Sequence, residues 1–156
     1  MTVEDKLVEM LKAQGLTCAT AESCTGGGIG SAITSVPGSS DVFAGGVVSY
    51  SNAVKRDVLG VSQESLDRYG AVSSEVACEM ASGVRRLLKT DLAVSVTGIA
   101  GPGGGSAEKP VGLVWFGVST ATGTRTERAI FAGDRASVRR QAVIHALGML
   151  TVAATG

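Results

Sequence analysis

The sequence is poor in aromatic residues and has no excess of charge of either sign. Phe, Trp and Tyr make up 4% of its 156 residues, and 14 Lys and Arg residues balance 14 Asp and Glu residues. Proteins that bind nucleic acids usually carry a basic surface, and those that bind single strands also offer aromatic rings for base stacking. We therefore expect no nucleic-acid partner.

Residues that bind metals or form disulfides are also scarce. The chain has one histidine and three cysteines, Cys18, Cys24 and Cys78, with no Cys-x-x-Cys pair. Structural zinc sites need several His or Cys ligands, and disulfide frameworks need an even number of cysteines. We therefore expect small buried thiols, no metal and no cofactor.

Long hydrophobic runs are absent as well. No apolar stretch approaches the roughly 18 residues that a transmembrane helix requires. Residues 1–12 alternate charged and apolar side chains and contain no signal-peptide core. We therefore expect a cytoplasmic protein with no membrane partner, and the length suits a single domain spanning 1–156.

Glycine, in contrast, is abundant. The chain has 22 glycines in 156 residues, twice the average share of roughly 7%. They concentrate at Gly26 to Gly28, at Gly45 and Gly46, and between Gly98 and Gly105. Glycine clusters between apolar segments indicate tight turns and places where the backbone closely approaches another group.

Apolar periodicity predicts that helices alternate with strands along the chain. The expected helices span residues 3–14, 25–35, 52–59, 63–68, 73–89 and 134–153, and the expected strands span 16–21, 42–50, 92–97, 111–120 and 126–132. This order predicts an α/β fold, a three-layer α/β/α sandwich with a mixed, mostly parallel sheet of about five strands. Sites in such sheets lie at strand ends, on loops that lead into helices, where the glycine clusters fall.

The first candidate site residue is Ser23, in the segment AESCTGGG that follows a strand and opens a helix. A hydroxyl there lies beside unpaired helix N–H groups, which can stabilise an oxyanion. Ser23 is thus a candidate nucleophile, with donors expected from Thr25 to Gly27. Two alternatives stay open, namely that Ser23 and Thr25 simply cap the helix, or that the glycines cradle a phosphate.

A serine nucleophile needs a base. The single histidine, His145, falls among apolar residues of the last helix and is expected to be structural. Lysine is the remaining common partner, and Tyr50 and Lys55 follow a predicted strand at a spacing that can place them together. A surface lysine beside a half-buried tyrosine is the alternative. Cys24 competes with Ser23, because a thiol at a helix N-terminus has a lowered pKa.

The glycine-rich segment VTGIAGPGGG at 96–105 ends the most apolar predicted strand. Its glycines free backbone N–H groups to face an anion or a planar ring, although a mobile loop is the alternative. Arg135, at the start of the last helix, can bind a phosphate with two parallel hydrogen bonds or can simply face solvent.

Together these segments resemble the C-terminal domain of the CinA-like competence/damage-inducible family, whose stand-alone members are nicotinamide-nucleotide amidases. The resemblance covers about residues 5 to 150. It rests on AESCTGG at 21–27, FAGGVVSYSNAVK at 43–55, GAVSSEVA at 70–77, VTGIAGPGGG at 96–105, KPVG at 109–112 and GDR at 133–135.

The resemblance implies hydrolysis of the carboxamide of nicotinamide mononucleotide to nicotinic acid mononucleotide and ammonia. It implies a serine nucleophile with lysine and tyrosine partners, which fall on Ser23, Lys55 and Tyr50, and a homo-oligomer such as a dimer or trimer. The segments 25–27 and 97–105 and the last helix would hold the substrate through Thr25, Gly26, Gly27, Thr97, Gly98, Gly101, Gly103 and Arg135. A non-catalytic nucleotide-binding module and a partner domain remain the alternatives.

Overall fold

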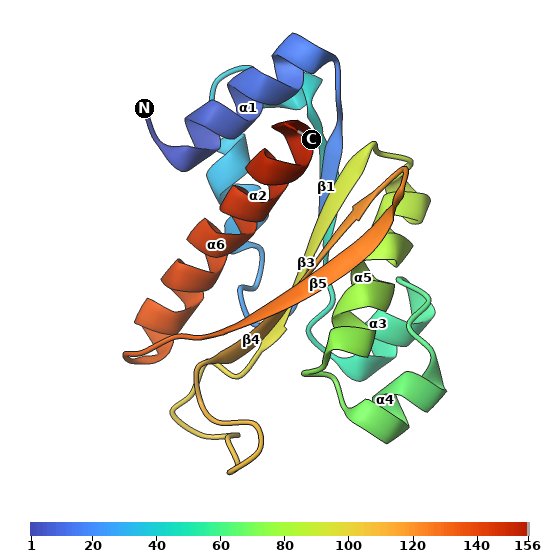
Figure 1. Cartoon of the computed structure of the whole chain (residues 1–156), viewed down its shortest axis with the longest axis vertical. Coiled ribbons are helices and arrows are strands. Elements are labelled where there is room, and N and C mark those ends of the chain that lie inside the picture. The colour runs from blue at the N-terminus through green and yellow to red at the C-terminus, as the bar shows by residue number, and fades with distance from the viewer. Residues whose placement is uncertain (156) are drawn as a thin grey trace.

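The computed structural model describes residues 1–155, which form one five-stranded sheet between two layers of helices (Figure 1). The strands are β1 (Cys18–Glu22), β2 (Phe43–Val48), β3 (Leu92–Gly98), β4 (Leu113–Thr120) and β5 (Gly123–Ile130), and they lie in the order β2-β1-β3-β4-β5. β1 pairs in parallel with both β2 and β3, whereas β4 is antiparallel to both β3 and β5. Four strands therefore share one direction, and the predicted mixed, mostly parallel sheet is confirmed.

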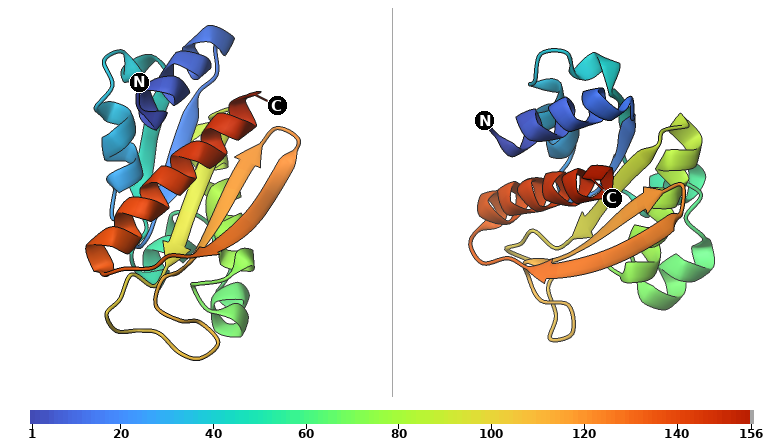
Figure 2. Two further views of the ribbon diagram at one scale, coloured as in Figure 1. Left: turned by 60° about the vertical axis from the view of Figure 1, so that its left-hand side comes forward. Right: turned by 45° about the horizontal axis from the view of Figure 1, so that its top comes forward.

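Three helices cover each face of the sheet. α1 (Val3–Gln14), α2 (Gly28–Thr34) and α6 (Arg135–Thr155) form one layer, and α3 (Asn52–Asp57), α4 (Gln63–Tyr69) and α5 (Ser74–Leu88) form the other (Figures 1 and 2). A short 3-10 turn, Ser39–Asp41, leads into β2. This arrangement is the predicted three-layer sandwich.

The central strands are buried because both of their faces are covered. Every residue of β1 is buried, as are the first six residues of β3. Edge strand β2 instead alternates half-buried and exposed residues. α5 packs its apolar stripe of Val76, Met80 and Val84 against the sheet, so its amphipathic spacing accounts for its position.

Local capping residues account for most helix ends. The Ser73 side chain accepts from the Val76 N–H at the start of α5, and Gly15 ends α1 in the left-handed conformation with a φ of 66°. The Asp134 carboxylate accepts from the Ser137 N–H at 2.9 Å at the start of α6. These residues lie at ends of the helices expected over 3–14, 73–89 and 134–153.

Two predicted boundaries are wrong by three residues. The helix expected from Thr25 begins at Gly28, with Gly27 as its N-cap and no side-chain cap. The strand expected from residue 126 begins at Gly123, because Thr120 pairs directly with Gly123 and leaves a two-residue hairpin connection. Gly123 has a φ of 142°, which glycine adopts without steric cost.

No helix within residues 1–155 is both long enough and apolar enough to span a bilayer.

Candidate active site

A pocket of about 280 Å³ opens where the carboxyl ends of β1, β2 and β3 meet. Parallel pairing aligns Glu22 of β1 with Val48 of β2 and Val96 of β3, so the segments that follow these strands gather at one edge. Eight residues predicted for the site line this pocket: Ser23, Tyr50, Lys55, Thr97, Gly98, Gly101, Gly103 and Arg135. Thr25, Gly26 and Gly27 do not line it.

Ser23 lies on the turn directly after β1. Its N–H donates to the Val96 carbonyl at 3.0 Å, which extends the β1–β3 ladder by one bond and fixes the start of the turn. The Ser23 hydroxyl faces Lys55, whose Nζ lies 3.1 Å from Oγ. The predicted pairing of serine and lysine is therefore present in the structure.

Lys55 is almost wholly buried, with 1% of its surface exposed. The Ser51 hydroxyl caps α3 by accepting from the Val54 N–H, and this short helix carries the Lys55 side chain back toward β1. No carboxylate within residues 1–155 forms an ion pair with Lys55. Burial therefore lowers the pKa of Lys55 to about 8, because the charged form loses hydration without gaining a counter-ion.

The hydrogen-bond partners of Lys55 can also accommodate the neutral amine. Besides Ser23 Oγ, Nζ contacts the carbonyl of Ser49 at 2.8 Å and that of Tyr50 at 3.1 Å. A neutral amine has two N–H donors, and these two carbonyls accept both of them. The lone pair is then left to face the Ser23 hydroxyl, as a general base requires.

Cys24, the competing nucleophile, is buried beside Ser23. Burial raises the pKa of the Cys24 thiol to about 11, so the thiol stays protonated near neutral pH. The thiolate is the nucleophilic form of cysteine. The chemistry at this turn therefore favours Ser23.

Tyr50 lies differently from the prediction. Its side chain is 64% exposed, and its hydroxyl accepts from Nη2 of Arg135 at 3.4 Å; within residues 1–155 it forms no hydrogen bond with Ser23 or Lys55. The backbone turn that directs the Tyr50 carbonyl at Lys55 leaves the ring facing outward. The expected joint proton relay of phenol and ammonium therefore stays a prediction.

The glycine-rich loop is shaped largely by packing. A Cβ on Gly98 would lie 2.7 Å from the Val114 side chain, and one on Gly101, whose φ is 84°, would lie 2.5 Å from the Val111 side chain. A Cβ on Gly103 would meet nothing within 4 Å. The hydroxyl of Thr97 donates to the Ala71 carbonyl at 2.9 Å. These residues form one wall of the pocket.

Arg135 and the loop are joined at the mouth of the pocket. Nη1 of Arg135 donates to the Gly101 carbonyl at 2.9 Å, which leaves the other guanidinium nitrogens near Tyr50. A guanidinium held in this way presents a positive charge and spare N–H donors to the pocket.

Glu22 explains why the start of α2 departs from the prediction. Its buried carboxylate accepts from the Thr25 hydroxyl at 2.6 Å and from the N–H groups of Ile29 and Gly30 at 2.8 and 3.0 Å. It thereby satisfies the helix N-terminus that Thr25 was expected to cap. The Gly26 N–H donates to the Ser23 carbonyl at 3.1 Å, so it is not available as the predicted oxyanion donor.

Three residues near the site were missed by sequence reasoning: Glu22, Asn52 and Arg139. Asn52 lines the pocket beside Lys55. Arg139 of α6 donates to the carbonyls of Cys24 and Thr25 at 3.1 and 3.2 Å. The sequence offers one signal for Glu22, a carboxylate inside an otherwise uncharged strand next to Ser23.

His145 lies away from the pocket. Its ring packs 4.3 Å from that of Phe116, centroid to centroid, and its Nε2 lies 2.6 Å from Oε1 of Glu127. This packing agrees with its expected structural role. No group of three or more His, Cys, Asp or Glu side chains that could hold a metal ion occurs within residues 1–155.

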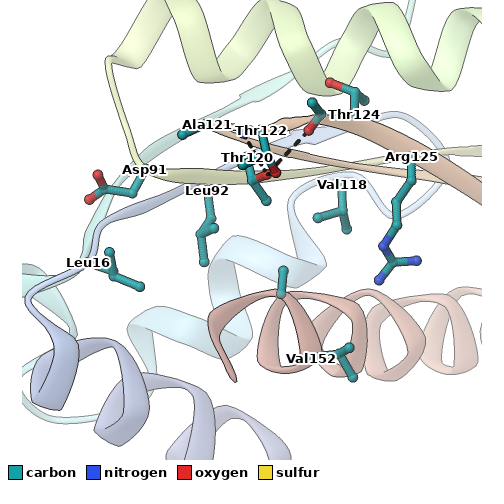
Figure 3. Close-up of a pocket in the computed structure, with 12 residues that line it drawn as sticks. Leu16, Asp91, Leu92, Val118, Thr120, Ala121, Thr122, Thr124, Arg125 and Val152 are labelled. Carbon is teal, nitrogen blue, oxygen red and sulfur yellow. Dashed lines mark hydrogen bonds between the residues drawn. The ribbon is translucent and has the colours of Figure 1, made fainter. Parts of the chain in front are cut away.

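A second pocket, of about 640 Å³, lies at the opposite end of the sheet, between the β4–β5 hairpin and the end of α6 (Figure 3). Leu16, Leu92, Val118 and Val152 contribute its apolar side chains. The carboxylate of Asp91 at its rim already accepts from the Thr17 N–H and hydroxyl. Threonines supply the hydroxyls that line this pocket, and no histidine or lysine lies among its lining residues, so it does not pair a hydroxyl with a histidine or lysine base.

Comparison with known proteins gives close matches. The E. coli K12 nicotinamide-nucleotide amidohydrolase PncC is 50% identical over 151 residues, which make up 96% of this chain and 92% of that protein. A CinA-like protein of Parasynechococcus marenigrum is 51% identical, but this chain spans 37% of its length. The chain likewise spans 36% of a relative from Caldanaerobacter subterraneus that is 51% identical.

Solved structures match equally well. The competence/damage-inducible protein CihA of Agrobacterium tumefaciens superposes with a TM-score of 0.94 at 43% identity, covering 99% of this chain and 96% of that one. The family model described as the CinA C-terminal domain matches residues 1–153. The chain therefore belongs to the CinA C-terminal domain family, as its motifs predict.

Proposed function

We propose that this protein hydrolyses the carboxamide of nicotinamide mononucleotide to nicotinic acid mononucleotide and ammonia, through an acyl-enzyme on Ser23. The observation that carries the proposal is the contact between Ser23 Oγ and a buried lysine amine at 3.1 Å. The substrate is inferred from PncC, the amidohydrolase that is 50% identical over nearly the whole of both chains.

In the first step, neutral Lys55 takes the hydroxyl proton of Ser23 as Oγ attacks the amide carbon. The tetrahedral intermediate then collapses, the C–N bond breaks, and the Lys55 ammonium returns the proton to the departing nitrogen, which leaves as ammonia. In the second step Lys55 deprotonates a water that attacks the acyl-enzyme. Collapse of this second intermediate breaks the bond to Oγ, which takes back the proton from Lys55.

The oxyanion would be held by the N–H groups of Cys24 and Thr25, the two residues that follow the nucleophile. This assignment revises the expectation from the sequence, because the Gly26 N–H is already bonded to the Ser23 carbonyl. Donors placed where negative charge develops are worth about 2.7–4 kcal/mol each in acyl transfer.

Arg135, Tyr50 and the loop from Thr97 to Gly103 would bind the ribose-phosphate at the mouth of the pocket. Arg135 supplies the positive charge that a phosphate requires. The exposed Tyr50 phenol, held near Arg135, would contact the substrate there, and its carbonyl would help to orient the Lys55 amine. A homo-oligomer and a cytoplasmic location remain predictions.

The decisive experiment measures ammonia released from nicotinamide mononucleotide by the purified protein and by Ser23→Ala. The wild type should turn over, and the variant should lose roughly 10³-fold or more in kcat. An unchanged melting temperature would show that the fold is retained.

Three other outcomes would contradict the proposal. Binding of the nucleotide without ammonia release would favour a non-catalytic binding module, and binding of neither substrate nor product would favour a partner domain. Wild-type turnover by Ser23→Ala would remove Ser23 as the nucleophile.

A further inference from the structure

Arg139 reaches from α6 to the turn that carries Ser23, although it lies 115 residues from Cys24 in sequence. Its Nε donates to the Cys24 carbonyl at 3.1 Å, and its Nη2 donates to the Thr25 carbonyl at 3.2 Å. The Ser23 carbonyl accepts from the Gly26 N–H at 3.1 Å. Each of the three carbonyls of the turn therefore has a donor.

These contacts determine where the turn's N–H groups point. In a trans peptide the C=O and N–H bonds point in opposite directions. The N–H groups of Cys24 and Thr25 belong to the peptides whose carbonyls are held by Gly26 and Arg139, so they point away from those donors. Within residues 1–155 neither N–H group donates to another residue, which leaves two adjacent donors beside the nucleophile.

We propose that Arg139 is a positioning residue, which holds the Cys24–Thr25 peptide so that its N–H faces the oxyanion formed at Ser23. The inference rests on the proposed function, since it assigns the support of the oxyanion site. Arg139 does not line the pocket, and it would act through the backbone rather than on the substrate.

Two physical effects make the contact matter. The turn continues into Gly26 and Gly27, which have φ values of 59° and 100°, and glycine's conformational freedom would let an untethered peptide rotate. In addition, a positively charged donor on the Cys24 carbonyl polarises the same peptide and strengthens its N–H as a donor. Loss of the guanidinium would therefore both misplace and weaken the oxyanion donor.

The test compares Arg139→Met with Arg140→Met, a matched change at the next residue of α6, which is also exposed but donates no hydrogen bond within residues 1–155. We expect Arg139→Met to lower kcat for nicotinamide mononucleotide by about 10- to 100-fold with KM changed less than about twofold, because it affects the transition state alone. Arg140→Met should match the wild type. Added guanidinium should restore part of the activity of Arg139→Ala.

A second measurement is independent of the substrate. A fluorophosphonate reacts with an activated serine to give a tetrahedral adduct whose oxygen occupies the oxyanion site, and mass spectrometry follows the labelling. We expect Ser23 to be labelled at least about tenfold more slowly in Arg139→Met than in Arg140→Met. If Arg139→Met does not fold, Arg139→Lys, which keeps one cationic donor, carries the same comparison.

The outcomes separate this inference from the proposed function. A wild type that releases no ammonia but labels faster than the Arg139 variant would remove the proposed substrate and leave the positioning role. Equal labelling rates in the two variants, or a loss confined to KM, would overturn the positioning role. A wild type that is not labelled at Ser23 would overturn both.

Discussion

At the scale of single residues, the defining feature is a lysine buried without a counter-ion. Lys55 contacts two backbone carbonyls and the Ser23 hydroxyl, so its neighbours accept hydrogen bonds but carry no charge. A lysine in such surroundings exists partly as the free amine near neutral pH. Burial therefore allows Lys55 to act as a base, which an exposed lysine would not do near neutral pH.

The pH dependence of turnover follows from this burial. Because the pKa of Lys55 is lowered to about 8, kcat/KM should rise about tenfold per pH unit below that value and level off above it. The measurement is kcat/KM for nicotinamide mononucleotide between pH 6 and 10. Lys6→Met, at an exposed position, should keep the same midpoint, whereas a profile flat from pH 6 to 9 would contradict a lysine base.

The pairing of Ser23 with Lys55 was predicted because His145 was expected to be structural, which left lysine as the base, and because the family resemblance assigns that role to Lys55. It did not predict how the Tyr50 side chain lies, because a turn can present either the carbonyl or the ring of the same residue to a neighbour. Arg139 was missed because its partners are backbone carbonyls far away in sequence. Every residue has such a carbonyl, so the amino-acid types give no indication of the contact.

At the scale of elements, α5 is held against the strands and against the loop after α3. Its Gly83 allows close approach to the backbone, because a Cβ there would lie 1.9 Å from the Leu59 carbonyl oxygen. On α6, a Cβ at Gly148 would meet nothing within 4 Å. An added side chain would therefore clash at Gly83, whereas the space around Gly148 would accommodate it.

Alanine substitution at these two positions tests the packing of α5 at Gly83 and the helix propensity of α6 at Gly148. Gly83→Ala should destabilise the protein by about 1–3 kcal/mol, because the added methyl forces α5 away from Leu59. Gly148→Ala should stabilise it by about 0.5–1 kcal/mol through helix propensity. Urea unfolding measures both, and a Gly83→Ala protein as stable as the wild type would show that α5 shifts freely.

Helix and strand positions were largely predictable because caps and apolar spacing are local. The start of α2 was not, because Glu22 supplies its cap from within β1. The pairing of Thr120 with Gly123 also lies outside what periodicity shows. In both cases a contact outside the element itself, rather than propensity, sets the boundary.

At the scale of the whole molecule, Lys55 couples the site to the stability of the fold. The unfolded chain exposes Lys55 at an ordinary pKa near 10.5, whereas the folded protein lowers it to about 8. Between these values the unfolded state binds more protons, so stability attributable to Lys55 rises with pH. Below pH 8 Lys55 is charged in the folded state as well, so the free-energy cost of burying this charge lowers the stability by its full amount.

Comparison with Lys55→Met isolates this effect. From pH 7.5 to pH 10 the unfolding free energy of the wild type should gain on the order of 1–3 kcal/mol relative to the variant. Urea titrations at the two pH values give the difference. A wild type that loses stability relative to Lys55→Met over this range would show that Lys55 is charged and stabilised in the folded state.

The β4–β5 hairpin has a practical consequence. Ala93 of β3 pairs with Ser119, while Gly98 pairs with Val114, so the connection at Ala121 and Thr122 lies at the end of the sheet away from Ser23. Both connecting residues are exposed. A fluorophore or a solid support attached there would leave the mouth of the pocket open to substrate. The hairpin is therefore a suitable attachment site for a sensor or an immobilised catalyst.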